Sequence, residues 1–391
     1  MNIADRLSCI RPSATHAVNA KALELKGQGR KIVSLAIGEP DFPTPAHICK
    51  AAQRAIDEGF TRYTAVSGIP ELRRAVGTYY KRSCDIEPPV ESVLVSNGGK
   101  HSLFNYFMAL LNPGDEVIIP APYWLSYPDM VMLAGGVPVF LPVSAQEGFR
   151  LTPEKLVKAF TPKTRLLILN APSNPTGVSY SQEELDALVA CCVQKGVCVA
   201  SDEIYDRIVY SPAQSVSAIR WWQRCPELVA VFNGCAKSFS MTGWRVGYCV
   251  GHPKLIKAMD TLQSQSTSNV CSIAQKAAVA ALEGSYDCVA EMAATFQRRR
   301  DLALNIMASW KGVLCPKPEG AFYLFADMGC YFGKSGIANS TDLCTYFLEK
   351  AGVALVPGGA FGDDACVRLS YAVADEELEH ALKSMEKVLP A

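Results

Sequence analysis

Short apolar runs alternate with amphipathic stretches through the middle of the chain, from about Ser92 to Gly251. The apolar runs are rich in β-branched residues and have few polar interruptions, which is typical of strands covered on both faces. They predict strands over residues 92–96, 115–120, 137–143, 164–170, 197–202, 228–232 and 245–251. Because helical patterns lie between these runs, the sequence predicts a mostly parallel central sheet flanked by helices.

One of the intervening helices has both of its ends marked in the sequence. Ser181 and Glu184 have the spacing of a capping box, and Gly196 follows the last apolar residue of the pattern. A capping box satisfies the free N–H groups at the start of a helix, and glycine readily adopts the conformation that ends one. We therefore expect a helix between Ser181 and Gly196.

The pattern changes in the last hundred residues. The elements predicted there are a helix over 286–310, strands within 320–328, 352–358 and 366–372, and a helix over 375–389. This order is typical of an α+β domain. We expect an α/β protein with a large domain over residues 44–284 and a smaller α+β domain formed by residues 1–43 and 285–391.

Composition and charge narrow the classes of function. Basic and acidic residues number 38 each, which leaves no net field to attract nucleic acid or an anionic membrane. The first residues contain no apolar stretch of signal-peptide length, and no apolar run is long enough to span a bilayer. The 15 cysteines lack C-x-x-C spacing and the 5 histidines lack metal-ligand spacing. We expect a cytoplasmic protein without nucleic-acid, membrane or metal partners.

The ends of the predicted strands carry glycines and polar residues, and ligands of open α/β sheets bind beyond such ends. At the first of them, Gly98 and Gly99 precede a helix, so backbone amides and the helix N-terminus could hold a phosphate. The same pair also fits an ordinary turn. The spacing matches neither the dinucleotide fingerprint nor the P-loop, which disfavours a dinucleotide or a nucleoside triphosphate.

Three further strand ends add candidate chemistry. Asn174 lies between two prolines, and Asp202 and Tyr205 follow a buried strand. Lys237 lies among small residues eight positions before Arg245. Plain structural alternatives remain open for each: a turn asparagine, a helix-capping aspartate and a surface lysine. Together, the four strand ends suit a ligand with a phosphate, a ring nitrogen, a phenolic oxygen and an aldehyde, which describes pyridoxal 5′-phosphate.

Motifs along nearly the whole chain strengthen this interpretation. They are "GEPDFPTP", "YTAVSGIPELR", "APYWLSYP", "APSNPTG", "SDEIY", "AKSFSMTGWRVGY" and "VRLSYA". In this order and spacing, the chain resembles the class I aminotransferases of fold type I that use pyridoxal phosphate, in particular the bacterial aspartate aminotransferase subgroup. The resemblance implies a homodimer with composite active sites.

The resemblance also implies a role for each cofactor-facing residue. Lys237 binds the cofactor covalently, and Asp202 pairs with the protonated ring nitrogen. Asn174 and Tyr205 hold the ring hydroxyl oxygen, and Trp124 stacks on the ring. Lys237, Asp202 and Tyr205 form the expected catalytic group.

Further residues are assigned to the phosphate in the same way. The backbone amides of Gly99 and Lys100 and the charge of Arg245 are similar to the family's phosphate site, and Tyr63 resembles a tyrosine that reaches the phosphate from the neighbouring subunit. Gly234 departs from the family pattern, because many relatives have a serine or threonine there as an extra phosphate donor. Cofactor affinity is the property that this departure puts in question.

Substrate contacts follow from the same resemblance. Arg368 is similar to the arginine that clamps the substrate α-carboxylate, and Gly38 lends that carboxylate a backbone amide. Trp124 and Asn174 border the substrate as well. A planar guanidinium suits a bidentate carboxylate contact, which orients the Cα–H bond for removal of its proton. Desolvation and nearby cations lower the pKa of a lysine toward use as a nucleophile and base, which is the setting expected for Lys237.

The expected reaction moves an amino group from an L-amino acid, with aspartate favoured, to 2-oxoglutarate by a ping-pong mechanism. Aromatic or alanine donors, a C–S β-lyase on the same fold, and a regulator without catalysis stay open as alternatives, because a fold does not fix a function. A dicarboxylate needs a second binding group, for which Arg11, Ser13 and Thr15 are candidates. Arg11 also fits a solvated charge near the N-terminus.

Overall fold

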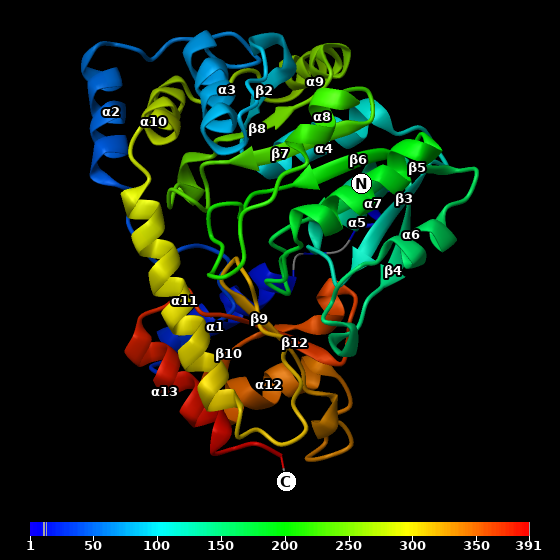
Figure 1. Cartoon of the computed structure of the whole chain (residues 1–391). Coiled ribbons are helices and arrows are strands. Elements are labelled where there is room, and N and C mark those ends of the chain that lie inside the picture. Colours follow the sequence, from blue (N-terminus) through cyan, green and yellow to red (C-terminus); the bar gives the residue numbers. More distant parts are fainter. Residues whose placement is uncertain (11, 13, 391) are drawn as a thin grey trace.

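The computed structural model describes residues 1–10, 12 and 14–390. A seven-stranded sheet forms its larger part, with the strand order β2-β8-β7-β6-β5-β3-β4 (Figure 1). The strands are β2 (Val93–Ser96), β3 (Glu116–Ala121), β4 (Val137–Pro142), β5 (Thr164–Asn170), β6 (Cys198–Asp202), β7 (Val229–Gly234) and β8 (Gly247–Val250). All neighbours pair in parallel except β8, which is antiparallel to both β2 and β7. The predicted strands and the mostly parallel sheet are confirmed.

Both faces of this sheet are covered by helices, as the uniformly apolar strands predict. Successive side chains of a strand point to opposite faces, so Val93 and Val95 join one core cluster while Leu94 joins another. The helices whose side chains enter the first cluster are α2 (Ala46–Asp57), α3 (Pro70–Cys84), α6 (Pro153–Ala159), α7 (Gln182–Lys195), α8 (Ile219–Arg224), α10 (Ser272–Glu283) and, through Val289, the start of α11 (Asp287–Met307). The helices of the second cluster are α4 (Gly99–Leu110), α5 (Ser126–Leu133) and α9 (Pro253–Ser266).

The helix predicted between Ser181 and Gly196 is α7. The Glu184 N–H donates to Ser181 Oγ at 3.2 Å, and the Ser181 N–H donates to the Glu184 carboxylate at 2.7 Å. Gly196 ends the helix with a φ of 68°. Each predicted end is therefore confirmed.

A second, smaller group of elements has its own core. It contains an antiparallel sheet of β11 (Val356–Pro357), β12 (Cys366–Ser370) and β9 (Tyr323–Asp327), and a parallel pair of β1 (Val33–Ser34) and β10 (Val353–Ala354). Its helices are α1 (Ala14–Gly27), α11 (Asp287–Met307), α12 (Ser340–Lys350) and α13 (Asp375–Glu386). Figure 1 shows the long helix α11 running from the large sheet down to α13, with which it is in contact.

This arrangement agrees with the predicted α+β character of the last hundred residues. The division of the chain after residues 43 and 284 stays a prediction, and we propose it as the domain boundary. In the part of the chain that the structure describes, no helix combines the length and apolar character needed to cross a bilayer.

Candidate active site

A cleft of about 370 Å³ opens where the carboxyl ends of the parallel strands meet the smaller sheet. Because β8 is antiparallel, the residues just before it lie at the same edge. The predicted site residues that line this cleft are Gly38, Gly99, Lys100, Trp124, Asn174, Asp202, Tyr205, Lys237, Arg245 and Arg368. The structure thus brings together residues that are far apart in the sequence.

Four further candidate residues are Tyr63, Thr15, Arg11 and Ser13. Tyr63 does not line the cleft and its side chain is 91% exposed. Thr15, on α1, does line the cleft. Arg11 and Ser13 lie outside the described residues.

Lys237 follows β7 and its side chain is half-buried in the cleft. Its Nζ donates to the Gly38 carbonyl at 2.6 Å. Burial lowers the pKa of Lys237 to about 8, and the charges of Arg245 and Arg368 act in the same direction. An amine in this state is available as a nucleophile near neutral pH.

The lowered pKa predicts how Lys237 reacts in the cofactor-free protein. We expect acetylation of its Nζ by acetic anhydride to reach half of its maximal rate near pH 8, because only the unprotonated amine reacts and burial moves its pKa down from 10.5 to about 8. Competitive labelling read by mass spectrometry, with the ε-amine of Nα-acetyl-lysine as the reference, measures this value. A half-maximum near that of the reference amine would contradict the desolvated state.

Asp202 ends β6 and has an exposed fraction of only 6%. Its Oδ2 accepts a hydrogen bond from the Tyr127 hydroxyl at 2.6 Å, and its Oδ1 accepts from the Ile204 N–H at 3.3 Å. Burial raises the pKa of Asp202 to about 6. Among the described residues, no basic side chain forms an ion pair with it. This carboxylate is therefore suited to bind a cationic group of a ligand.

Tyr205 and Asn174 lie beside this carboxylate at the same edge of the sheet. The Tyr205 hydroxyl is 2.9 Å from the Tyr323 hydroxyl. The Asn174 side-chain oxygen accepts from Arg368 Nη1 at 3.0 Å, which leaves its amide N–H groups available to a ligand oxygen. Asn170 supports both neighbouring loops, because it accepts from the Asn174 N–H at 2.8 Å and donates to the Asp202 carbonyl at 2.9 Å.

An anion cradle lies at the start of α4. The first N–H groups of a helix have no partner within it, so Gly99 and Lys100 present amides and a positive dipole end to the cleft. Arg245 stands over this end, with Nη2 donating to the Asn97 carbonyl at 3.3 Å. A Cβ on Gly98, whose φ is +90°, would lie 2.4 Å from Arg245 Nη2. Gly98 is therefore required for the close approach of the arginine.

The departure from the family pattern at Gly234 has a structural cause. Gly234 pairs with Gly247 between β7 and β8. A Cβ at Gly234 would lie 2.8 Å from the Val246 carbonyl oxygen and 2.9 Å from the Gly247 Cα, and both of these atoms belong to the backbone. The strands here approach too closely for a serine or threonine, and the anion cradle is built without that hydroxyl.

Arg368 is a buried cation without an acidic partner among the described residues. Its side chain is 2% exposed and lies over the rings of Tyr323 and Phe361, with centroid distances of 4.6 and 4.9 Å. Its Nη2 donates to the Ala36 carbonyl at 2.8 Å, and its Nε has no hydrogen-bond partner in the described part of the chain. Burial lowers the pKa of Arg368. A guanidinium in this state has free capacity for a carboxylate.

The sequence assigned only the backbone of Lys100 to the site, but its side chain is part of the cleft too. The Nζ lies 5.0 Å from the centre of the Trp124 ring. Partial desolvation lowers the pKa of Lys100, and the charge of Arg245 adds to this effect. The cleft therefore contains a further cation besides the two arginines and Lys237.

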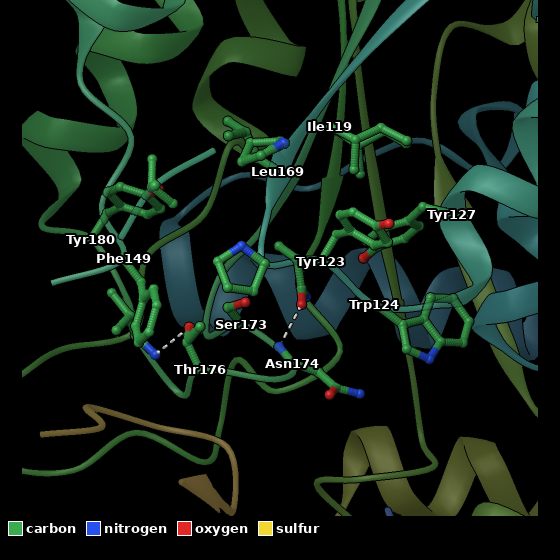
Figure 2. A pocket seen from close by; sticks show the side chains of 16 residues that line it. Ile119, Tyr123, Trp124, Tyr127, Phe149, Leu169, Ser173, Asn174, Thr176 and Tyr180 are labelled. Carbon is green, nitrogen blue, oxygen red and sulfur yellow. Dashed lines mark hydrogen bonds between the residues drawn. The ribbon is translucent and has the colours of Figure 1, made fainter. Parts of the chain in front are cut away.

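A second, smaller cavity adjoins the cleft behind Trp124, Tyr127 and Asn174 (Figure 2). Its volume is about 30 Å³, which corresponds to a single water molecule. Figure 2 shows Ser173, Asn174 and Thr176 on the loop that closes it, opposite Tyr123 and Tyr127. Of these two adjoining cavities, the larger cleft is therefore the one with room for a cofactor or substrate.

The comparisons with known proteins agree with this geometry. Residues 30–385 match the family described as aminotransferase class I and II. A probable aspartate/prephenate aminotransferase of Rickettsia bellii is 49% identical, and the match covers 98% of each chain. An aspartate/prephenate aminotransferase of Cereibacter sphaeroides is 48% identical, over 97% of this chain and 96% of that protein.

Solved structures show the same likeness in three dimensions. The aspartate aminotransferase of Thermus thermophilus with maleate has a TM-score of 0.94 and 42% identity, with both chains fully covered. The aspartate aminotransferase of Rhizobium meliloti has a TM-score of 0.95 and 42% identity, over 100% of this chain and 99% of that one. Together with the cleft, these likenesses define an amino-group-transferring enzyme. The chain belongs to the class I and II aminotransferases.

Proposed function

We propose that this aminotransferase uses pyridoxal 5′-phosphate and exchanges amino groups between dicarboxylic substrates, with L-aspartate as donor and 2-oxoglutarate or prephenate as acceptor. The observation that carries the proposal is the combination in one cleft of an unpaired buried carboxylate (Asp202), an unpaired buried guanidinium (Arg368) and a lysine of lowered pKa (Lys237). The names of the relatives, which mention aspartate and prephenate, support the choice of substrates.

The residues present fit this cofactor. Among the described residues, Asp202 forms no ion pair, and the protonated ring nitrogen of the cofactor is a cation that suits this buried carboxylate. The start of α4 and Arg245 form an anion cradle that suits the phosphate. Asn174 and Tyr205 supply donors for the ring hydroxyl oxygen. When bound, pyridoxal phosphate supplies an electron sink and an aldehyde for the lysine amine.

Each side chain then has a defined task. Arg368 binds the α-carboxylate of the substrate through its planar fork and thereby fixes the direction of the Cα–H bond. The Lys237 amine, unprotonated above about pH 8, accepts the proton from Cα as a general base. Asp202 stays ionised and holds a proton on the ring nitrogen, which keeps the electron sink effective. The second carboxylate of a dicarboxylic substrate requires another cation, and Lys100 beside Trp124 is suited to bind it.

We further propose a homodimer in which a second copy completes each site. Tyr63 is almost fully exposed in the single chain, although the resemblance to the aminotransferase family assigns this tyrosine to the cofactor phosphate. A groove lined by Asn97, Trp244, Arg245 and Cys271 adjoins the anion cradle from outside and offers space for a tyrosine of a second copy. A sedimentation measurement that finds only monomers at assay concentrations would contradict this part of the proposal.

A panel of substrates tests the proposed function. With 2-oxoglutarate as acceptor, we expect kcat/KM for aspartate to exceed that for alanine by roughly 30- to 100-fold, because a close charge pair contributes about 2 kcal/mol or more. Prephenate should replace 2-oxoglutarate as acceptor, and double-reciprocal plots should be parallel, as a ping-pong mechanism requires. Equal values for alanine and aspartate would contradict the dicarboxylate preference. Pyruvate formed from a thioether substrate without any acceptor would favour the β-lyase instead.

A further inference from the structure

The segment 35–42 runs from β1 along the cleft, and its backbone contacts two of the functional cations. The Ala36 carbonyl accepts from Arg368 Nη2 at 2.8 Å, and the Gly38 carbonyl accepts from Lys237 Nζ at 2.6 Å. Both acceptors belong to the main chain. Their positions therefore depend on how the segment is held at its two ends.

The first end of the segment is attached to the smaller sheets. The Leu35 N–H donates to the Ala354 carbonyl at 2.9 Å, and the Leu35 carbonyl accepts from the Ser370 N–H at 2.7 Å. The first bond continues the β1–β10 pairing by one residue, and the second joins the segment to the end of β12. Upstream of Ala36, the chain is thus fixed by regular backbone pairing.

The other end is attached through Arg299 of α11. Its Nη1 and Nη2 donate to the two carboxylate oxygens of Asp41 at 2.8 and 2.9 Å, and its Nε donates to Asp375 at 2.8 Å. The Arg299 side chain is 7% exposed, whereas those of Asp41 and Asp375 are 28% and 35% exposed. Its Cζ also lies 5.5 Å from the centre of the Phe42 ring, which packs edge-on against Phe296 of the same helix.

This constellation is a clamp rather than a surface ion pair. A bidentate guanidinium restricts both the distance and the orientation of its carboxylate, and a buried one does so with little screening. One further bond of the segment, from Thr242 Oγ1 to Glu39 at 2.7 Å, is exposed. The clamp joins three parts of the chain: the end of segment 35–42, α11 and the first turn of α13.

We propose that Arg299 is a positioning residue for substrate binding. By holding Asp41 it fixes the positions of the Ala36 and Gly38 carbonyls, and through the Ala36 carbonyl it fixes the orientation of the Arg368 guanidinium. Arg299 itself does not line the cleft. The proposal rests on the proposed role of Arg368 in binding the substrate carboxylate. It adds a structural element that transmits the state of α11 and α13 to the cleft.

The test uses the cofactor-loaded enzyme and maleate, an unreactive dicarboxylate, as the binding probe. We expect Arg299→Gln and Asp41→Asn to weaken maleate binding about 10-fold in calorimetric titration and to raise KM for both substrates, with kcat changed by less than about threefold. Arg299→Lys keeps the charge but not the fork, so it should give an intermediate effect. Arg298→Gln is the matched control, because Arg298 is 60% exposed and, among the residues that the structure describes, its side chain bonds to Asp375 alone.

Hydrogen exchange gives a readout that does not depend on substrate. Peptides that cover residues 36–42 should exchange faster in Arg299→Gln than in Arg298→Gln. If Arg299→Gln does not fold, Asp41→Asn carries the test, since it changes only the more exposed partner of the Arg299–Asp41 pair. Unchanged maleate affinity in a folded variant, with or without a lower Tm, would overturn the proposal. Failure of the unmodified enzyme to bind maleate would instead count against the proposed dicarboxylate function.

Discussion

Replacing Asp202 by asparagine is expected to lower kcat by about 10²- to 10⁴-fold, because removing one partner of a buried ion pair costs about 3–5 kcal/mol. Asparagine keeps the shape of the side chain but cannot hold a proton on a ring nitrogen. Steady-state kinetics with aspartate and 2-oxoglutarate measure the loss. The absorbance of the bound cofactor shows how much of the enzyme is loaded.

Two controls separate this loss from a structural defect. Tyr127→Phe removes the hydrogen bond to Asp202 but keeps the charge, so its kcat should fall by only about 10-fold or less. The pKa of Asp202 is raised to about 6 in the folded protein, so its ionised form opposes folding at pH values above about 6. The cofactor-free Asp202→Asn protein should therefore be at least as stable at pH 8 as the unmodified protein. Near-normal turnover of loaded Asp202→Asn would refute the assigned role.

Replacing Arg368 by lysine is expected to lower kcat/KM by about 10²- to 10³-fold for the amino donor and the keto acceptor alike, since impairing the hydrogen bonds of one partner in a buried charge pair costs about 2–5 kcal/mol. Lysine keeps the charge but cannot donate to Asn174, Ala36 and a substrate carboxylate from one plane. Because both substrates of a ping-pong enzyme use the same carboxylate site, the two KM values should rise together.

The comparison with Lys100→Met makes the Arg368 result specific. That variant removes the cation beside Trp124, so it should lower kcat/KM for aspartate. The value for alanine, which has a single carboxylate, should stay unchanged. Arg368→Lys should lower kcat/KM for both donors. A variant of Arg368 that impairs aspartate and leaves alanine unchanged would assign the arginine to the second carboxylate instead.

The chemistry at the strand ends could be predicted because it depends on topology. Asp202 and Lys237 each follow an apolar run, and Asn174 follows another by four residues. Parallel strands bring their carboxyl ends to one edge, so residues that are distant in the sequence must converge there. The same reasoning predicts the anion cradle at Gly98 and Gly99.

Other parts of the site depend on contacts that no local pattern encodes. Tyr323 gains its importance from the hydroxyl of Tyr205, 118 positions away, and Asn170 from the Asp202 carbonyl on the neighbouring strand. The Lys100 side chain lies beside the Trp124 ring, which no local pattern indicates. Tyr127 did leave a signal, because it follows Trp124 by three residues, which is close to one helical turn. The pair of Asp41 and Arg299 spans 258 positions and carried no signal in a single sequence.

Gly234 illustrates the opposite difficulty. The sequence shows the lack of a hydroxyl and therefore directs attention to the phosphate. The structure shows a close approach of two strands, where any Cβ would meet backbone. A residue that differs from a family pattern can thus reflect the spacing of the main chain rather than a change in ligand affinity.

The reversed direction of β8 has a consequence for how this enzyme can diverge. A parallel neighbour would need a crossover of a dozen or more residues, but an antiparallel one needs only a loop. Lys237 and Arg245 therefore belong to a single loop between β7 and β8, and their separation is set by the length of the chain rather than by the helices around them. The outer helices can be exchanged or lengthened in evolution without altering this distance. An insertion or deletion within the loop itself cannot be accommodated in that way.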